Sequence, residues 1–219
     1  MGLTPDLIGA GWLWSMNVLL IVAIGLAIWQ ADWAQLVVER ALQHSLFATI
    51  ILLTLVWQIR AGLSPGLTIH ILGITAVTLM LGWAFAILAG LIALLFTSIL
   101  GDESLAMFGI NGIVTVSIPA FVSYGIMLWE RSRGFHNFFA YLFFCGFFGA
   151  AIAVASAGMT MVMVLWIAGV YGWDTLLHEY VRYLPLIMLP EAFINGTVIS
   201  GLMVFHPQRL LTLDESRYL

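Results

Sequence analysis

Charged residues are scarce in this sequence. Only 8% of the residues are charged, there is no lysine, and 63% are hydrophobic. A soluble domain averages about 25% charged residues, so this composition excludes a water-soluble globule. The net charge of −4 comes without a basic patch, which argues against nucleic-acid binding. The composition therefore indicates a membrane protein.

Other absences narrow this class. The apolar runs do not alternate with polar residues, which excludes a β-barrel and leaves a helical bundle, because only these two architectures satisfy the backbone in lipid. A single cysteine, Cys145, cannot form a disulfide within the chain and is expected to pack as a small apolar side chain. The N-terminus lacks a basic region, so no cleavable signal peptide is predicted. No HExxH sequence, phosphate loop or activated nucleophile is present, so no enzyme is predicted.

The stretch 61–101 contains no charged side chain and is the starting point for the prediction of membrane helices. As one straight helix of about 40 residues it would extend ~60 Å, twice the ~30 Å hydrocarbon core of a bilayer. The stretch must therefore contain a turn. Gly82, the only glycine between Gly73 and Gly90, is its expected position. His70 then lies at the entrance of the first of two helices.

The remaining apolar runs predict an all-α, polytopic helical membrane protein with a single integral membrane domain over residues 1–219. About seven transmembrane helices are expected, at about 9–29, 46–60, 68–82, 83–100, 107–129, 137–164 and 183–206. A polar tail over 207–219, without regular structure, is expected to follow. The run 134–173 accommodates one long span or two, so six or eight spans remain alternatives.

The arginines predict the orientation, because cytoplasmic loops carry an excess of positive charge. With the N-terminus outside, five arginines fall in cytoplasmic segments and two fall outside. The cytoplasmic set is Arg40, Arg131, Arg133, Arg209 and Arg217, and the outer set is Arg60 and Arg182. We therefore predict a multi-pass protein of the bacterial inner membrane with its N-terminus outside, its C-terminus in the cytoplasm and His70 near the outer face.

Polar side chains within the apolar spans are the functional candidates, because burying one in lipid is unfavourable. They are Asn17, Thr68, His70, Asn111, Glu191 and Asn195. Imidazole is a common ligand of Ni, Co, Cu and Zn, although an isolated histidine at a helix end is more often a hydrogen-bonding residue. Glu191 and Asn195 lie one turn apart on one helix face, either as a ligand or proton site or as a polar clamp between helices.

One motif resembles a known family. Residues 66–73, Gly-Leu-Thr-Ile-His-Ile-Leu-Gly, are similar to the G-[ST]-x-H-L-L-G signature of the CbiM/NikM family. These proteins are the substrate-binding membrane subunits of energy-coupling-factor (ECF) transporters for cobalt and nickel. Further parts of the family pattern follow in the same order, at 100–103, 108–111, 189–197 and 206–207.

The resemblance implies an ECF S-component-like bundle that captures a divalent transition metal and works with a transmembrane partner and two ATPases. Nickel or cobalt is the implied substrate, with copper or zinc as alternatives, and no prosthetic group is expected. The implied ligands are nitrogens of the Met1 amine, of a histidine at position 2 and of His70. Gly2 stands at that second position here, so we expect a site built from His70, Met1 and Asp6. Carboxylate is a harder ligand than imidazole, so this site is expected to be weaker and less selective for nickel.

Gly2 also favours a second hypothesis, a non-transporting accessory or scaffold protein of the same fold in a metal-enzyme or respiratory system. A third hypothesis is an intramembrane enzyme. It would require Glu191 or His178 in a water-filled cavity beside a second activated group.

Overall fold

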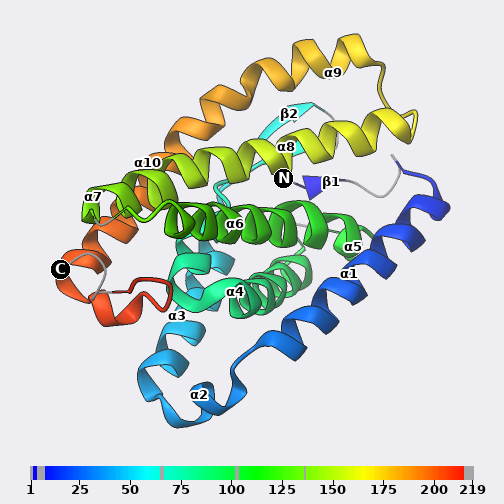
Figure 1. Cartoon of the computed structure of the whole chain (residues 1–219). Helices are drawn as coiled ribbons and strands as arrows, with labels where there is room; N and C mark the ends of the chain where they lie inside the picture. The colour runs from blue at the N-terminus through cyan, green and yellow to red at the C-terminus, as the bar shows by residue number, and fades with distance from the viewer. Residues whose placement is uncertain (1, 4–7, 65–66, 102–103, 136, 215–219) are drawn as a thin grey trace.

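The computed structural model describes residues 2–3, 8–64, 67–101, 104–135 and 137–214, with residues 2–3, 61–64 and 67–69 described by their backbone alone. The chain folds into a bundle of apolar helices (Figure 1). The long helical segments are α1 (Ala10–Gln30), α4 (Ile74–Ile99), Leu105–Ser132, Phe138–Ile167 and Trp173–Phe205, and α3 (Arg40–Val56) is shorter. Each of the five long segments has the length and apolar character needed to cross a membrane. The prediction of a helical membrane bundle is confirmed.

The last three of these segments consist of several elements each. Leu105–Ser132 contains the 3₁₀ turn η2 (Leu105–Met107), α5 (Phe108–Asn111), the π-helix η3 (Gly112–Ser117) and α6 (Ile118–Ser132). Phe138–Ile167 contains α7 (Phe138–Ala140), the π-helix η4 (Tyr141–Phe148) and α8 (Gly149–Ile167). Trp173–Phe205 contains α9 (Trp173–Glu179), the 3₁₀ turn η5 (Val181–Tyr183) and α10 (Leu184–Phe205). Between α1 and α3 lies the short helix α2 (Trp33–Val38).

Helix α4 is broken at Gly82. This residue has φ 77° and ψ 162°, a conformation essentially restricted to glycine, and so it ends one helical segment and starts another. The first segment, residues 74–81, is short, about 12 Å at 1.5 Å per residue. We call it the half-helix below. With the two parts of α4 counted separately and the short elements α2 and η6 left aside, the described residues contain seven helical segments: the five long ones, with α4 counted as two, and α3.

Two predicted spans have different bounds in the structure. The span expected at 68–82 begins only at Ile74, because Gly73 has φ 68° in the left-handed region and Leu67–Ile69 form a strand. Thr68 therefore lies in that strand and not in a helix. The span expected at 46–60 is α3, which begins at Arg40 and ends at Val56.

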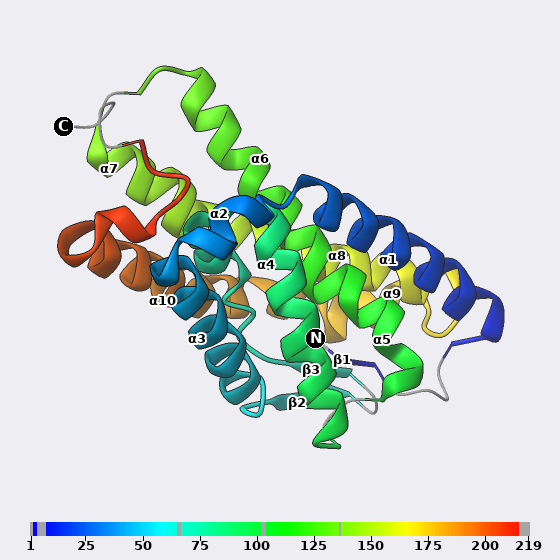
Figure 2. The same ribbon diagram turned by 90° about the horizontal axis from the view of Figure 1, so that it is seen from below.

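A small antiparallel sheet precedes α4 and was not predicted. Its strands are β1 (Gly2–Leu3), β2 (Ala61–Ser64) and β3 (Leu67–Ile69), in the order β1-β3-β2. Gly2 of β1 pairs with Thr68 of β3. Figure 2 shows the N-terminal strand and the rest of this sheet on one side of the bundle and the C-terminal end on the opposite side. The sheet therefore places the N-terminal segment alongside the strand that leads to His70.

The tail was expected to lack regular structure, and for residues 207–209 this expectation is wrong. Pro207–Arg209 form a 3₁₀ turn, η6. The backbone N–H of Leu211 then donates to the carbonyl of Met80 (3.0 Å), and the N–H of Thr212 donates to the carbonyl of Leu79 (3.3 Å). The break at Gly82 removes the helical partners that these carbonyls would otherwise have, and the tail replaces them.

The core of the bundle surrounds α4. Helices α1, α3 and α6 pack against it, and its Leu79, Ile87 and Leu94 are fully buried. On α1, Ile21 and Trp29 are instead largely exposed, as expected of side chains that face lipid.

Candidate metal-binding site

His70 lies in the four-residue segment between β3 and α4, residues 70–73, which we call the His70 segment. Its side chain is 5% exposed. The ring nitrogen Nδ1 is 3.2 Å from the carbonyl oxygen of Ile71. A carbonyl only accepts hydrogen bonds, so this contact requires a proton on Nδ1 and leaves the lone pair of the neutral ring on Nε2. A metal ion would therefore be bound through Nε2.

The surroundings of His70 favour the neutral form of its imidazole. Burial lowers the pKa of His70 well below the usual value for histidine. The indole ring of Trp57 lies beside it, with 5.4 Å between the ring centroids. Trp57 is fully buried at the end of α3, and its Nε1–H donates to the carbonyl of Leu72 (3.1 Å). Neutral imidazole is the form that binds transition metals, so these surroundings suit a ligand.

Two side chains of α10 reach the His70 segment. The carboxylate of Glu191 accepts hydrogen bonds from the backbone N–H of Leu72 (2.9 Å) and of Gly73 (2.7 Å). Asn195, one turn later, accepts one through Oδ1 from the N–H of Ala76 (2.8 Å). Its Nδ2 donates back to the Glu191 side chain (2.9 Å). Glu191 is 1% exposed and Asn195 is fully buried.

The local sequence explains why α4 needs this help. The first N–H groups of a helix have no intrahelical partner and are usually capped by Ser, Thr, Asp or Asn just before the helix. At the start of α4 this position is Gly73, which has no side chain. From a distant helix, Asn195 supplies an acceptor for Ala76 in the first turn of α4, and Glu191 supplies acceptors for Leu72 and Gly73 just before it. The negative carboxylate also suits the positive end of the helix dipole. The pair is therefore a polar clamp between α10 and α4.

The other candidates are distributed differently. Thr68 lies two residues before His70, in β3, where its backbone pairs with Gly2 and with Gly62. Asn111 is buried at the end of α5, where its carbonyl accepts a hydrogen bond from the Thr115 hydroxyl. Close to it, Gly109 packs against Asn17 of α1. Met1 and Asp6 lie outside the described residues. The structure thus links His70, Glu191 and Asn195 through one short segment and places Asn111 in a different helix pair.

Within the described part of the chain, no three His, Cys, Asp or Glu side chains gather in an arrangement that would hold a metal. A site at His70 would therefore draw its further ligands from backbone groups or from residues outside that part, such as Met1 and Asp6. The site expected from the sequence, His70 with Met1 and Asp6, therefore stays a prediction.

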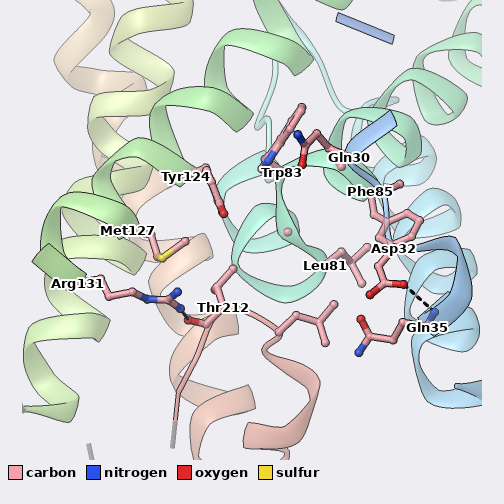
Figure 3. A pocket seen from close by; sticks show the side chains of 14 residues that line it. Gln30, Asp32, Gln35, Leu81, Trp83, Phe85, Tyr124, Met127, Arg131 and Thr212 are labelled. Carbon is pink, nitrogen blue, oxygen red and sulfur yellow. Dashed lines mark hydrogen bonds between the residues drawn. The ribbon is translucent and has the colours of Figure 1, made fainter. Parts of the chain in front are cut away.

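A separate cavity of about 250 Å³ lies at the other end of the half-helix, around Gly82 (Figure 3). Figure 3 shows Asp32 bonded to the backbone of Gln35, and Arg131 donating to the carbonyl of Thr212. The half-helix lies between this cavity and His70, so the cavity does not contain the imidazole.

Sequence reasoning missed Trp57 and the N-terminal strand. Nothing in the sequence singled out Trp57, yet it contacts both His70 and Leu72. A usable signal was present for the clamp itself. A helix that starts after Gly73 without a capping residue needs acceptors from elsewhere, and Glu191 with Asn195 was the one acidic and amide pair at helical spacing within an apolar run.

These features define a class, the multi-pass helical membrane proteins, and the bundle matches solved structures within it. A crystal structure described as a truncated transition metal transporter has a TM-score of 0.82 and 18% identity, with 94% of this chain and 100% of that chain covered. A second, described as a transition metal transporter, has a TM-score of 0.79 and 17% identity, with 93% of each chain covered. At 17–18% sequence identity, the similarity to these two structures establishes the fold alone.

The sequence profile of the CbiM family, described as the cobalt uptake substrate-specific transmembrane region, matches residues 3–209. The chain belongs to the CbiM family. This places it in a metal-transport family of the membrane and not among enzymes, which removes the intramembrane-enzyme hypothesis. No curated protein sequence matches the chain.

Proposed function

We propose that this chain is the substrate-binding subunit for uptake of a divalent transition-metal ion, nickel or cobalt, with His70 as a ligand. The observation that supports this most strongly is the buried imidazole of His70, whose Nδ1 lies 3.2 Å from the carbonyl oxygen of Ile71 and whose Nε2 is the nitrogen that would bind the metal. Nitrogen ligands suit Ni²⁺ and Co²⁺, and they suit Cu²⁺ and Zn²⁺ as well, so the ion is proposed by class.

The N-terminal segment is proposed to complete the site. Gly2 pairs with Thr68, two residues before His70, so the start of the chain runs beside the strand that leads to the imidazole. The Met1 amine and the Asp6 carboxylate are the proposed further ligands. Together with His70 they would form a mixed nitrogen and oxygen set that is weaker than one with a second imidazole.

Uptake would require partners and a fixed orientation. We propose an ECF transmembrane subunit and two ATPases as the partners in the bacterial inner membrane. The excess of arginines near the C-terminal side supports an N-terminus outside and a C-terminus in the cytoplasm. In that orientation His70 and the sheet would face outward, because they lie on the side of the bundle opposite the C-terminal end (Figure 2).

Gly2 supports one alternative, an accessory or scaffold membrane protein of the same fold. Replacement of a histidine by glycine at this position removes an imidazole ligand that the family pattern contains. A protein that has lost metal transport would bind no metal and would not associate with ATPase subunits.

Isothermal titration of the purified full chain in detergent with Ni²⁺, Co²⁺, Cu²⁺ and Zn²⁺ tests the proposal. His70→Ala is the test variant, and the exposed histidines provide matched controls in His44→Ala and His178→Ala. We expect stoichiometric binding that is lost in His70→Ala and kept in both controls. Binding by none of the forms, or binding that is unchanged in His70→Ala, would contradict it, and the first result would favour the accessory protein.

A further inference from the structure

We propose that Glu191 and Asn195 are positioning residues for His70, which set the metal affinity of the site without contacting the ion. The inference rests on the proposed function, because it concerns the affinity of a site that contains His70. It assigns to α10 a role that no ligand pattern in the sequence reveals.

Hydrogen bonds from two helices hold the backbone of the His70 segment. The carboxylate of Glu191 holds two consecutive amides of this segment, those of Leu72 and Gly73, at 2.9 and 2.7 Å. Trp57 holds the carbonyl of Leu72 from the side of α3. The peptide groups next to His70 are thus fixed from two different helices.

Both oxygens of the Glu191 carboxylate act as acceptors. One oxygen of Glu191, Oε2, accepts from Leu72, and the other, Oε1, accepts from Gly73 and from Asn195. A side chain that serves in this way must be an acceptor at both ends. Glutamine has the same size but would present an N–H group to one of the two backbone amides, so it cannot reproduce the contact.

Asn195 contacts both Glu191 and the start of α4. Its Nδ2 donates to both the carbonyl and the side chain of Glu191, and its Oδ1 accepts from Ala76 in the first turn of α4. Asn195 therefore orients the carboxylate and fixes the start of α4 at the same time. The two residues act as one unit on the Cα positions that follow His70.

Ligand geometry explains why this matters for affinity. Residues that orient a metal ligand typically change metal affinity 10- to 100-fold when they are mutated. His70 has no strand or helix of its own to fix it, because β3 ends at Ile69 and α4 begins at Ile74. The clamp replaces that missing support.

Cobalt titration of the purified full chain, followed by calorimetry and by visible absorption, tests the role. The variants are Glu191→Gln and Asn195→Ala, with His70→Ala as the reference for a lost ligand. Thr97→Val is the matched control, since Thr97 is fully buried in the other part of α4 and its hydroxyl bonds within its own helix. The visible ligand-field bands of bound Co²⁺ report its coordination geometry, which a general loss of stability does not alter at saturating metal. Thermal unfolding of the metal-free forms shows which variants fold.

We expect Glu191→Gln and Asn195→Ala to bind Co²⁺ at least tenfold more weakly than the wild type, with shifted bands, while Thr97→Val matches the wild type. Affinity and bands unchanged in folded Glu191→Gln, with binding lost in His70→Ala, would overturn the positioning role alone. Binding that is unchanged in His70→Ala would overturn the proposed function, and the positioning role with it. If Glu191→Gln does not fold, Asn195→Ala, which leaves the carboxylate in place, decides the same question.

Discussion

At both ends of the half-helix, residues 74–81, backbone polar groups lack a partner within the helix, and the two ends satisfy these groups differently. At the end near His70, backbone N–H groups are taken up by side chains of α10, a buried carboxylate and an amide. At the end near Gly82, backbone carbonyls are taken up by the backbone of the tail, at Leu211 and Thr212. Unsatisfied backbone groups are costly in lipid, so neither end can remain open.

The difference lies in what holds each end. Side chains of α10 fix the His70 end with three short hydrogen bonds, two to the His70 segment and one to the first turn of α4. A fourth bond joins the two side chains, Asn195 to Glu191, within α10. The Gly82 end depends on a tail that is itself held by Arg131 and Tyr141 through Thr212. We therefore expect changes at the His70 end to affect metal binding and changes at the Gly82 end to affect mainly the stability of the fold.

The largest expected effect comes from removing the carboxylate at the His70 end. Glu191→Leu leaves the buried N–H groups of Leu72 and Gly73 without an acceptor, so we expect a loss of about 3 kcal/mol of stability. Thermal unfolding of the metal-free protein in detergent, beside the Thr97→Val control, measures it. A loss no larger than that of the control would show that the clamp does not support the fold.

The next effect concerns the break itself. Gly82→Ala forces a side chain onto a backbone conformation that is essentially restricted to glycine, at a cost of about 2 kcal/mol. Gly25→Ala in α1 is the control, because a Cβ there meets no neighbouring atom. Equal thermal midpoints for the two variants would contradict a strained turn at Gly82.

A smaller effect is expected at the end that the tail holds. Thr212→Val removes a hydroxyl that donates to the carbonyl of Leu79 (2.7 Å) and pairs with the Tyr141 hydroxyl (2.7 Å), at a cost of about 1.5 kcal/mol. Metal affinity should stay within twofold of the wild type, in contrast to Glu191→Gln. Thr160→Val, which loses a hydrogen bond within α8, controls for the substitution. A tenfold loss of affinity in Thr212→Val would remove the distinction between the two ends.

The smallest effect is expected at Trp57. Trp57→Phe keeps an aromatic ring near His70 but loses the N–H donor to Leu72, so we expect about 1 kcal/mol of lost stability. The same variant should weaken cobalt binding by a fewfold, less than Glu191→Gln. A larger loss of affinity than in Glu191→Gln would shift the positioning role from α10 to α3.

Much of the fold follows from the sequence, because its apolar runs have few alternatives. Continuous apolar runs without charge can cross lipid only as helices, and the helical bundle was predicted from this constraint. The small sheet and the ordered tail depend on pairing between distant backbone segments, which leaves no periodic pattern in so short a strand as Gly2–Leu3. Because Gly73 has a left-handed conformation, α4 begins at residue 74 and not at residue 68 as predicted. Glycine adopts both left-handed and right-handed conformations, so the sequence alone does not predict which one occurs there.

The candidate site was predictable in type but not in construction. His70 was identified because it is a polar, metal-binding side chain in an apolar stretch. The choice between a ligand pair and a clamp for Glu191 and Asn195 required the structure, since only the position of Leu72 and Gly73 beside α10 shows what the two side chains bind.

X-ray absorption of Co²⁺ bound to the full chain tests the central claim, that His70 ligates the metal, most directly. Scattering from an imidazole ring is distinct from that of carboxylate, amine and water ligands. The account predicts one imidazole in the spectrum of the wild type and none in His70→Ala loaded at a high concentration of cobalt. A wild-type spectrum without imidazole, or an imidazole signal that persists in His70→Ala, would contradict it.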